Sequence, residues 1–279
     1  MTTKMKRSAT LSVYEAGLLA DDAYKDTSNS TVLGTQGWEP FNNSGERCVS
    51  SNVISGFFGR AYFNNQKKAV VVAFRGSENP IDNPINSNDW ITNVVQWGLG
   101  SCTSQLKQAL ELAVRVKRVC EQRGYRLLGF TGHSLGGALA AMVALETGSY
   151  AVTFNPAPIR QVTGSLRDDY IASHVMNFVS GKDFVSRLNP FVGFAIGSGK
   201  VAFATARSGA VGFATSVASS LATYGEAIGE AAAALTVESH QLIPGITVNV
   251  RSNQGHSMTG LVEFMKGKME YLIDPWPVR

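Results

Sequence analysis

The segment G-H-S-L-G at residues 132–136 restricts the fold of this 279-residue chain more than any other feature. It follows an apolar run at 125–131, which predicts a β-strand, and it precedes a run at 135–147 rich in alanine and leucine, which predicts a helix. A residue at a sharp turn from strand to helix has a strained backbone, and glycines two positions away on either side leave room for that turn. The sequence therefore predicts that the Ser134 hydroxyl stands at the end of a strand.

Strand and helix patterns alternate along the rest of the chain. Expected strands cover 56–63, 69–74, 125–131, 150–154, 174–179 and 245–250, and expected helices cover 12–25, 104–123, 135–147 and 257–272. Ser12 and Glu15 have the spacing of a capping box at the start of the first helix. The first two strands flank a turn-rich segment, which indicates an antiparallel pair. The alternation predicts an α/β fold with a mostly parallel sheet flanked by helices, in a single domain over 1–279.

Composition excludes several classes of function. The chain is 44% hydrophobic and carries 25 Lys and Arg against 21 Asp and Glu, a net charge of +4 that is too small and scattered for a nucleic-acid groove. Its three cysteines are far apart and lack metal-ligand spacing, so we expect reduced structural thiols. Acidic residues interrupt the N-terminal apolar pattern, so no conventional signal peptide is expected. We expect a protein that stays in the cytoplasm of the producing cell, is exported by another route, or binds peripherally to a membrane.

A serine nucleophile needs a base, and the chain has four histidines. His133 lies inside the turn itself, His174 opens a predicted strand, and His240 precedes a proline without further support. His256 lies in a loop between a predicted strand and a predicted helix, at the edge where α/β sheets place functional groups. We therefore interpret His256 as the base.

The base needs an orienting carboxylate. Asp168 and Asp169 lie in a polar segment and are expected to be solvated, whereas Asp183 follows the predicted strand 174–179 after a short turn. The chain order Ser134, Asp183, His256 is the order of α/β hydrolases.

Several spaced motifs now resemble the signatures of class 3 lipases, which group fungal-type triacylglycerol lipases, phospholipases and some feruloyl esterases. They are V-V-V-A-F-R-G-S at 70–77, D-W at 89–90, G-H-S-L-G-G at 132–137, K-D-F-V-S-R-L at 182–188 and G-H-S-M at 255–258. The resemblance covers about 10–190 and 240–272.

The resemblance implies a role for each matching residue. It implies Ser134 as nucleophile, Asp183 as orienting acid and His256 as general base, with the Ser77 side chain and the Leu135 amide as oxyanion donors. The supporting residues that it implies are Asp89, which would hold Ser77, and the turn glycines Gly132 and Gly136. No metal or diffusible cofactor is required by these residues.

The chain departs from the family pattern between Asp183 and His256. Residues 191–237 are rich in Ala, Gly, Ser and Val and contain few charges, which predicts a helical insertion. Three interpretations compete: a hairpin packed on the core, a lid over the active site, and a hairpin that enters a membrane or mediates oligomer or partner contacts.

We therefore expect a serine carboxylester hydrolase, a lipase or phospholipase that forms an acyl-enzyme on lipid esters at a membrane or lipid interface. Two alternatives stay open. One is a phospholipase toxin delivered by a specialised bacterial secretion system, and the other is a lipase-like module that binds a membrane or a protein without catalysis.

Overall fold

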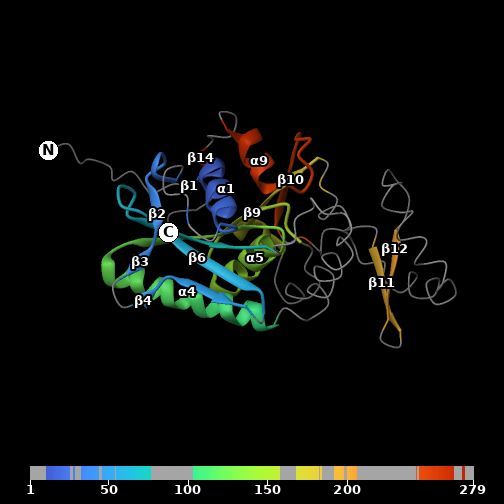
Figure 1. Ribbon diagram of the computed structural model, residues 1–279, viewed down its shortest axis with the longest axis horizontal. Helices are drawn as coiled ribbons and strands as arrows, with labels where there is room; N and C mark the ends of the chain where they lie inside the picture. Colours follow the sequence, from blue (N-terminus) through green and yellow to red (C-terminus); the bar gives the residue numbers. More distant parts are fainter. Residues whose placement is uncertain are drawn as a thin grey trace.

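A central sheet lies between two pairs of helices in the computed structural model. The structure describes residues 11–25, 28, 33–43, 46–53, 55–76, 103–157, 168–181, 183, 192–197, 200–205, 243, 245–266 and 272–273. Helices α1 (Val13–Asp22) and α9 (Met258–Met265) cover one face of the sheet, and α4 (Thr103–Arg123) and α5 (Leu135–Thr147) cover the other (Figure 1). The three layers agree with the predicted α/β class.

The sheet has eight strands in the order β13-β10-β9-β8-β7-β6-β2, with β5 also paired to β6. Their bounds are β2 (Trp38–Pro40), β5 (Val49–Asn52), β6 (Phe57–Asn64), β7 (Ala69–Phe74), β8 (Arg126–His133), β9 (Ala151–Phe154), β10 (Val175–Ser180) and β13 (Ile246–Val250). Neighbours from β7 to β13 pair in parallel, and β6 pairs antiparallel with β7, β5 and β2. The predicted mostly parallel sheet and its antiparallel pair are confirmed.

Small elements complete the described part. Strand β1 (Leu11–Ser12) pairs with β14 (Leu272–Ile273), β3 (Asn42–Asn43) pairs with β4 (Glu46–Arg47), and the short helix α6 (Asp168–His174) precedes β10. No helix in the described ranges is both long and apolar enough to cross a membrane.

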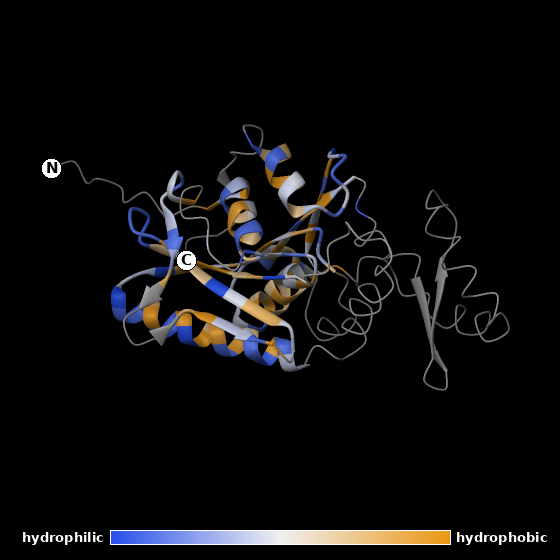
Figure 2. Ribbon diagram, viewed as in Figure 1, coloured by the Kyte–Doolittle hydropathy of each residue, from blue (hydrophilic) through white to orange (hydrophobic). Residues whose placement is uncertain are grey.

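Strand β7 is apolar on both sides because it packs against both helical layers. Its side chains at Val70, Val72 and Phe74 join the core beneath α4 and α5, whereas Val71 and Ala73 join the core beneath α1 and α9. Figure 2 shows the hydrophobic colouring of the central strands and of α5, in contrast to the mixed colouring of α4. A strand that is covered on both faces buries apolar area twice, which explains the unbroken apolar run in the sequence.

A capping box starts α1, as predicted. The Glu15 amide donates to Ser12 Oγ at 3.0 Å, and the Ser12 amide donates to Glu15 Oε2 at 2.8 Å. The buried Glu15 carboxylate also accepts hydrogen bonds from Trp38 Nε1 (2.9 Å) and Lys67 Nζ (2.5 Å), which lie on or beside the sheet. These contacts fix the start of α1 against the sheet.

The described part of the predicted helical insertion is a β-hairpin. Strands β11 (Val192–Gly197) and β12 (Lys200–Thr205) pair antiparallel, so the expectation of helix is wrong over these two strands. Large residues alternate with Gly or Ala in both of them, and this period of two favours strand over helix. Residues 191, 198–199 and 206–237 of the insertion lie outside the described residues.

Candidate active site

Ser134 occupies a strained turn between β8 and α5. Its φ of 55° and ψ of −125° lie outside the regions that residues with a side chain ordinarily adopt, a strain of about 1–3 kcal/mol. A Cβ at Gly132 would collide with the Gly136 carbonyl oxygen and lie 2.8 Å from that of Phe74. A Cβ at Gly136 would itself collide with the Phe74 carbonyl oxygen. Both glycines are therefore required by the close approach of β7 to the turn.

Backbone hydrogen bonds on both sides hold Ser134 in this conformation. Its amide donates to the Phe154 carbonyl at 3.1 Å, and its carbonyl accepts from the Ala157 amide at 3.0 Å. The residue is 2% exposed, and its Oγ makes no hydrogen bond within the described part of the chain. A buried hydroxyl with no protein partner costs free energy unless it serves a purpose, such as contact with a substrate.

Asp183 and His256 form a buried hydrogen-bonded pair beyond the ends of β10 and β13. The distance from His256 Nδ1 to Asp183 Oδ1 is 2.6 Å, and their side chains are 3% and 0% exposed. Because Nδ1 donates to the carboxylate, Nε2 is the nitrogen that can accept a proton. Two loops separated by a long stretch of chain therefore meet at one edge of the sheet.

His133 connects the serine turn to this pair. Its ring centroid lies 4.5 Å from that of His256, and its Nδ1 lies 2.8 Å from the hydroxyl of Tyr24. Burial, followed by the nearby charge of His256, lowers the pKa of His133 well below its ordinary value. Burial likewise raises the pKa of the Tyr24 hydroxyl. His133 is therefore neutral at pH 7.

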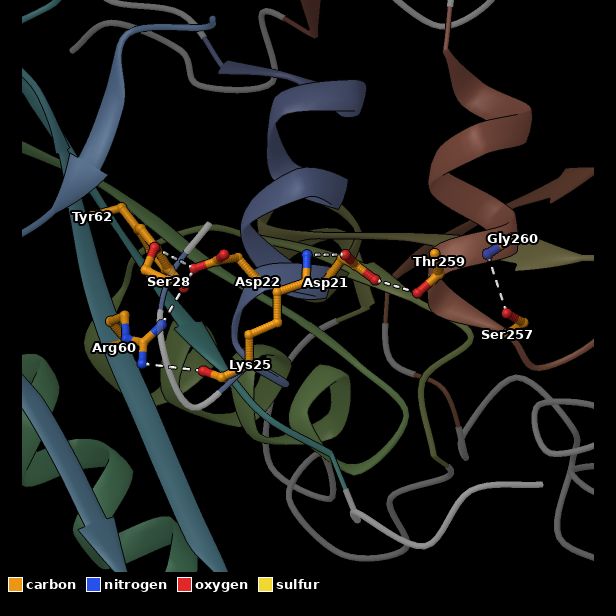
Figure 3. Close-up of polar contacts among 9 residues, drawn as sticks. All are labelled: Asp21, Asp22, Lys25, Ser28, Arg60, Tyr62, Ser257, Thr259 and Gly260. Atoms are coloured by element: carbon orange, nitrogen blue, oxygen red, sulfur yellow. Dashed lines mark hydrogen bonds and ion pairs between the residues drawn. The ribbon is translucent and has the colours of Figure 1, made fainter. Parts of the chain in front are cut away.

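The C-terminal end of α1 anchors the helix that follows His256 (Figure 3). Thr259 Oγ1 donates to Asp21 Oδ1 at 2.7 Å, and Asp21 also pairs with Lys25 at 2.8 Å. The neighbouring Asp22 accepts from the Tyr62 hydroxyl at 2.8 Å and pairs with Arg60 at 3.3 Å. The start of α9 is therefore tied through α1 to β6.

Residues 15–180 match the model of the Tle-like phospholipase domain. The chain belongs to this family. The matched range covers 59% of the chain, includes Ser134 and ends before Asp183 and His256. The prediction of a lipase or phospholipase family is confirmed.

One curated relative of this Tle-like phospholipase domain protein is an extracellular phospholipase A1 of Serratia liquefaciens, 34% identical over 159 residues. The match covers 54% of this chain and 43% of that protein, so it spans less than half of the relative's length. Among solved structures, the triacylglyceride lipase of Rhizomucor miehei has a TM-score of 0.44 at 17% identity and covers 63% of this chain and 72% of that one. The Lip2 lipase of Yarrowia lipolytica has a TM-score of 0.44 at 15% identity and covers 62% and 71%.

The structure brings Ser134, Asp183 and His256 to the same edge of the sheet, and Leu135 begins α5 directly after the serine. Ser77 and Asp89 lie outside the described residues. Gly76, which directly precedes Ser77, lies beside the turn, because a Cβ built on it would be 3.2 Å from Ser134 Cβ.

Among the described candidates, His174, Asp168 and Asp169 belong to α6. His174 ends α6, where its ring stacks on Tyr150 and contacts Tyr170, and His240 lies outside the described residues. Asp168 and Asp169 begin α6. Across the described ranges, no group of three or more His, Cys, Asp or Glu could hold a metal ion.

Sequence reasoning missed two contributors, Tyr24 and Asn155. Tyr24 reaches His133 from the end of α1, 109 residues away in sequence. Asn155 is buried after β9 with a φ of 42°. The sequence signal for Asn155 is its place immediately after a predicted strand, where polar residues of an α/β sheet gather at the site.

Proposed function

We propose that this protein hydrolyses acyl ester bonds of phospholipids, with Ser134 as the nucleophile. The observation that carries the proposal is the 2.6 Å bond between His256 Nδ1 and Asp183 Oδ1 at the edge where the strained Ser134 turn ends β8. A phospholipid substrate is supported by the family and by the name of the Serratia relative.

In the proposed reaction, Ser134 Oγ attacks the acyl carbonyl carbon while His256 Nε2 takes the hydroxyl proton. Asp183 holds the imidazole in the required tautomer and stabilises the imidazolium. The Leu135 amide and the Ser77 hydroxyl would stabilise the oxyanion. The Leu135 amide is available because it is at the first position of a helix, where no carbonyl of that helix accepts it.

The leaving alcohol takes the proton from His256, and an acyl ester of Ser134 remains. Water, deprotonated by His256, then attacks the acyl-enzyme and releases the fatty acid. These residues supply the nucleophile, the base and the oxyanion donors, so the proposal assigns no step to a metal ion.

We propose further that the protein binds its ester substrate at a lipid surface and that residues 191–237 contribute to the contact between the protein and this surface. The segment lies between Asp183 and His256 in sequence, and its two described strands alternate large apolar residues with small ones. Deletion of 195–235 should preserve hydrolysis of a soluble short-chain ester while lowering hydrolysis of phospholipid vesicles. A parallel loss on both substrates in a folded variant contradicts this assignment.

The Serratia relative is described as extracellular, and we propose that this chain also acts outside the cell that makes it. Active protein in the culture medium of intact producing cells supports this location. Activity confined to the cell interior contradicts it.

The nucleophile is tested by labelling with a fluorophosphonate. We expect one label per chain at Ser134, no label in Ser134→Ala, and a large loss of labelling rate in His256→Ala. His174→Ala is the matched control, because His174 is at the end of α6 and packs against Tyr150 and Tyr170. This variant should be labelled at the wild-type rate.

Fatty-acid release is then compared on phosphatidylcholine vesicles and triacylglycerol emulsions. Faster release from the emulsions would make the protein a neutral-lipid lipase rather than a phospholipase. A folded wild-type protein that neither labels nor hydrolyses would favour the binding-module alternative.

The oxyanion assignment is tested separately with Ser77→Ala. Loss of one oxyanion donor lowers kcat about 100- to 1,000-fold in hydrolases of this type. Unchanged ester hydrolysis would show that Ser77 is not a donor.

A further inference from the structure

The side chain of Asn155 joins the two loops that carry Asp183 and His256. Its Oδ1 accepts a hydrogen bond from the Ser180 amide at 2.8 Å, and its Nδ2 donates to the Gly255 carbonyl at 3.1 Å. Ser180 ends β10, and its carbonyl accepts a hydrogen bond from the Asp183 amide at 2.9 Å. Gly255 directly precedes His256. One amide group therefore sets the separation between the two loops.

The chemistry of this position suits asparagine closely. A backbone amide can only donate and a carbonyl can only accept, so the group between them needs one acceptor and one donor, as a primary amide provides. Asn155 is fully buried, so its side-chain amide is shielded from water. Its φ of 42° is in the left-handed region, which asparagine adopts more readily than most residues.

The backbone around Asn155 also contacts the nucleophile. The carbonyl of Phe154 accepts the Ser134 amide at 3.1 Å, and the amide of Ala157 donates to the Ser134 carbonyl at 3.0 Å. Residues 154–157 therefore touch the serine turn with their backbone, and they touch the Asp183 and His256 loops with one side chain.

Other hydrogen bonds join the same two loops nearer to the strands. The Gly181 amide donates to the Val250 carbonyl at 2.8 Å, and Ser180 Oγ donates to the Ser252 carbonyl at 3.2 Å. These bonds hold the strand ends together, whereas the Asn155 amide reaches the residue that adjoins His256. Loss of Asn155 should therefore release the histidine loop while the strands stay paired.

We infer that Asn155 is a positioning residue that keeps the imidazole of His256 aligned with Asp183 and Ser134. This inference rests on the proposed hydrolase function. A displacement of about 1 Å in a catalytic group can lower a rate about 100-fold. We expect Asn155→Gly to lower kcat about 10- to 100-fold with little change in KM, because the variant alters alignment and not the binding of the lipid.

Glycine is the preferred replacement because it adopts the left-handed backbone without strain and removes both side-chain hydrogen bonds. Asn155→Asp is the second variant, because it keeps the size of the side chain and the acceptor for Ser180 but loses the amide donor to Gly255. It should also lower kcat, because a carboxylate oxygen cannot donate to the Gly255 carbonyl, and it keeps the inference testable if the glycine variant does not fold.

Asn177→Ala is the matched control. Asn177 is also a fully buried asparagine, and it accepts a hydrogen bond from Thr153 Oγ1 at 2.6 Å within the same sheet. It lies in the middle of β10, where it pairs with Thr153 of β9 and Thr247 of β13, before the strand ends that lead into the Asp183 and His256 loops. Both variants should lower the urea midpoint, but the control should keep the wild-type kcat when both are assayed well below their midpoints.

A spectroscopic readout separates positioning from general destabilisation. The proton between His256 Nδ1 and Asp183 Oδ1 should give a far-downfield NMR resonance in the wild type and in Asn177→Ala. We expect this resonance to broaden or disappear in Asn155→Gly, with a parallel loss of fluorophosphonate labelling rate.

Wild-type kcat and an unchanged resonance in both Asn155 variants would overturn the inference, and so would an equal loss of kcat in Asn177→Ala. An inactive, unlabelled wild-type protein would instead refute the proposed hydrolase function, so the two failures are distinguishable.

Discussion

The hydroxyl of Thr259 donates a 2.7 Å hydrogen bond to Oδ1 of Asp21, which joins α1 to α9 across 238 positions of sequence. Thr259 is the third residue after His256, so this bond fixes the helix that follows the proposed base. Ser257 caps the same helix by accepting the Gly260 amide at 3.1 Å. The position of the histidine loop therefore depends on a helix at the other end of the chain.

Removal of this hydrogen bond should destabilise the protein measurably. Thr259→Val keeps the shape of the side chain but deprives the Asp21 carboxylate of a donor, so the free energy of unfolding should fall by about 1–3 kcal/mol in urea denaturation. Lys25→Ala is the control, because Lys25 is 41% exposed and such surface ion pairs contribute about 0–1 kcal/mol. Equal stability of Thr259→Val and wild type would contradict this role.

Asp183→Asn should abolish most activity without unfolding the protein. The amide cannot hold the His256 tautomer that leaves Nε2 able to accept a proton, and the equivalent change in a Ser-His-Asp enzyme lowers kcat about 10⁴-fold. Steady-state hydrolysis of a soluble ester measures the effect. Asp169→Asn, on the exposed start of α6, should retain wild-type kcat. Activity of Asp183→Asn within tenfold of wild type would refute the assigned role.

Gly136→Ala should damage both stability and activity. Its Cβ would collide with the Phe74 carbonyl oxygen, so β7 and the serine turn must separate, at a cost of about 1–3 kcal/mol or more. Gly34→Ala is the matched control, since a Cβ there meets no atom within 4 Å. Thermal melting and fluorophosphonate labelling should both fall in the first variant only. A stable, labelled Gly136→Ala protein would disprove the steric argument.

Stability should fall in mild acid because His133 is buried in its neutral form. Its folded pKa lies well below 6.5, so as the pH drops beneath 6.5 the unfolded chain binds a proton that the folded chain does not. The contribution to the free energy of unfolding is complete above pH 6.5 and decreases by about 1.4 kcal/mol per pH unit below it, until the folded pKa is reached.

Urea denaturation between about pH 7.5 and about pH 5 tests this linkage. His133→Gln removes the titrating group, so its free energy of unfolding should decline less steeply with acid than that of the wild type. Parallel slopes for the two proteins would show that His133 does not bind a proton on unfolding in this range.

The strand-turn-helix around Ser134 could be predicted because its signals are local. The glycines, the apolar strand and the following helix are contiguous, and the capping box of α1 needs only Ser12 and Glu15. Asp183 and His256 could be proposed because each follows a strand pattern, and parallel strands end at one edge. Their mutual hydrogen bond is seen only in the folded structure.

The partners of Tyr24 and Asn155 could not be assigned from the sequence, although the place of Asn155 after a predicted strand is a signal for the site. Each acts through a hydrogen bond to a residue about 100 positions away, and no local periodicity records such a partner. The expectation of helix in the insertion is wrong over β11 and β12 for another reason. It rests on overall composition, whereas Val, Phe and Ile alternate with Ala and Gly in these two strands.

The parallel pairing of β10 with β13 has a consequence for how such chains can diversify. Asp183 follows one strand, and the chain must return to the far end of its neighbour, where Ile246 pairs with Met176. A crossover of this kind needs only a dozen or so residues, far fewer than lie between 183 and 246. Because closure entropy rises slowly with length, the surplus can be exchanged for another sequence at small thermodynamic cost, while the sheet holds the acid and the base in register. The connection is thus a natural place for related chains to vary in sequence while the Asp183–His256 pair is kept.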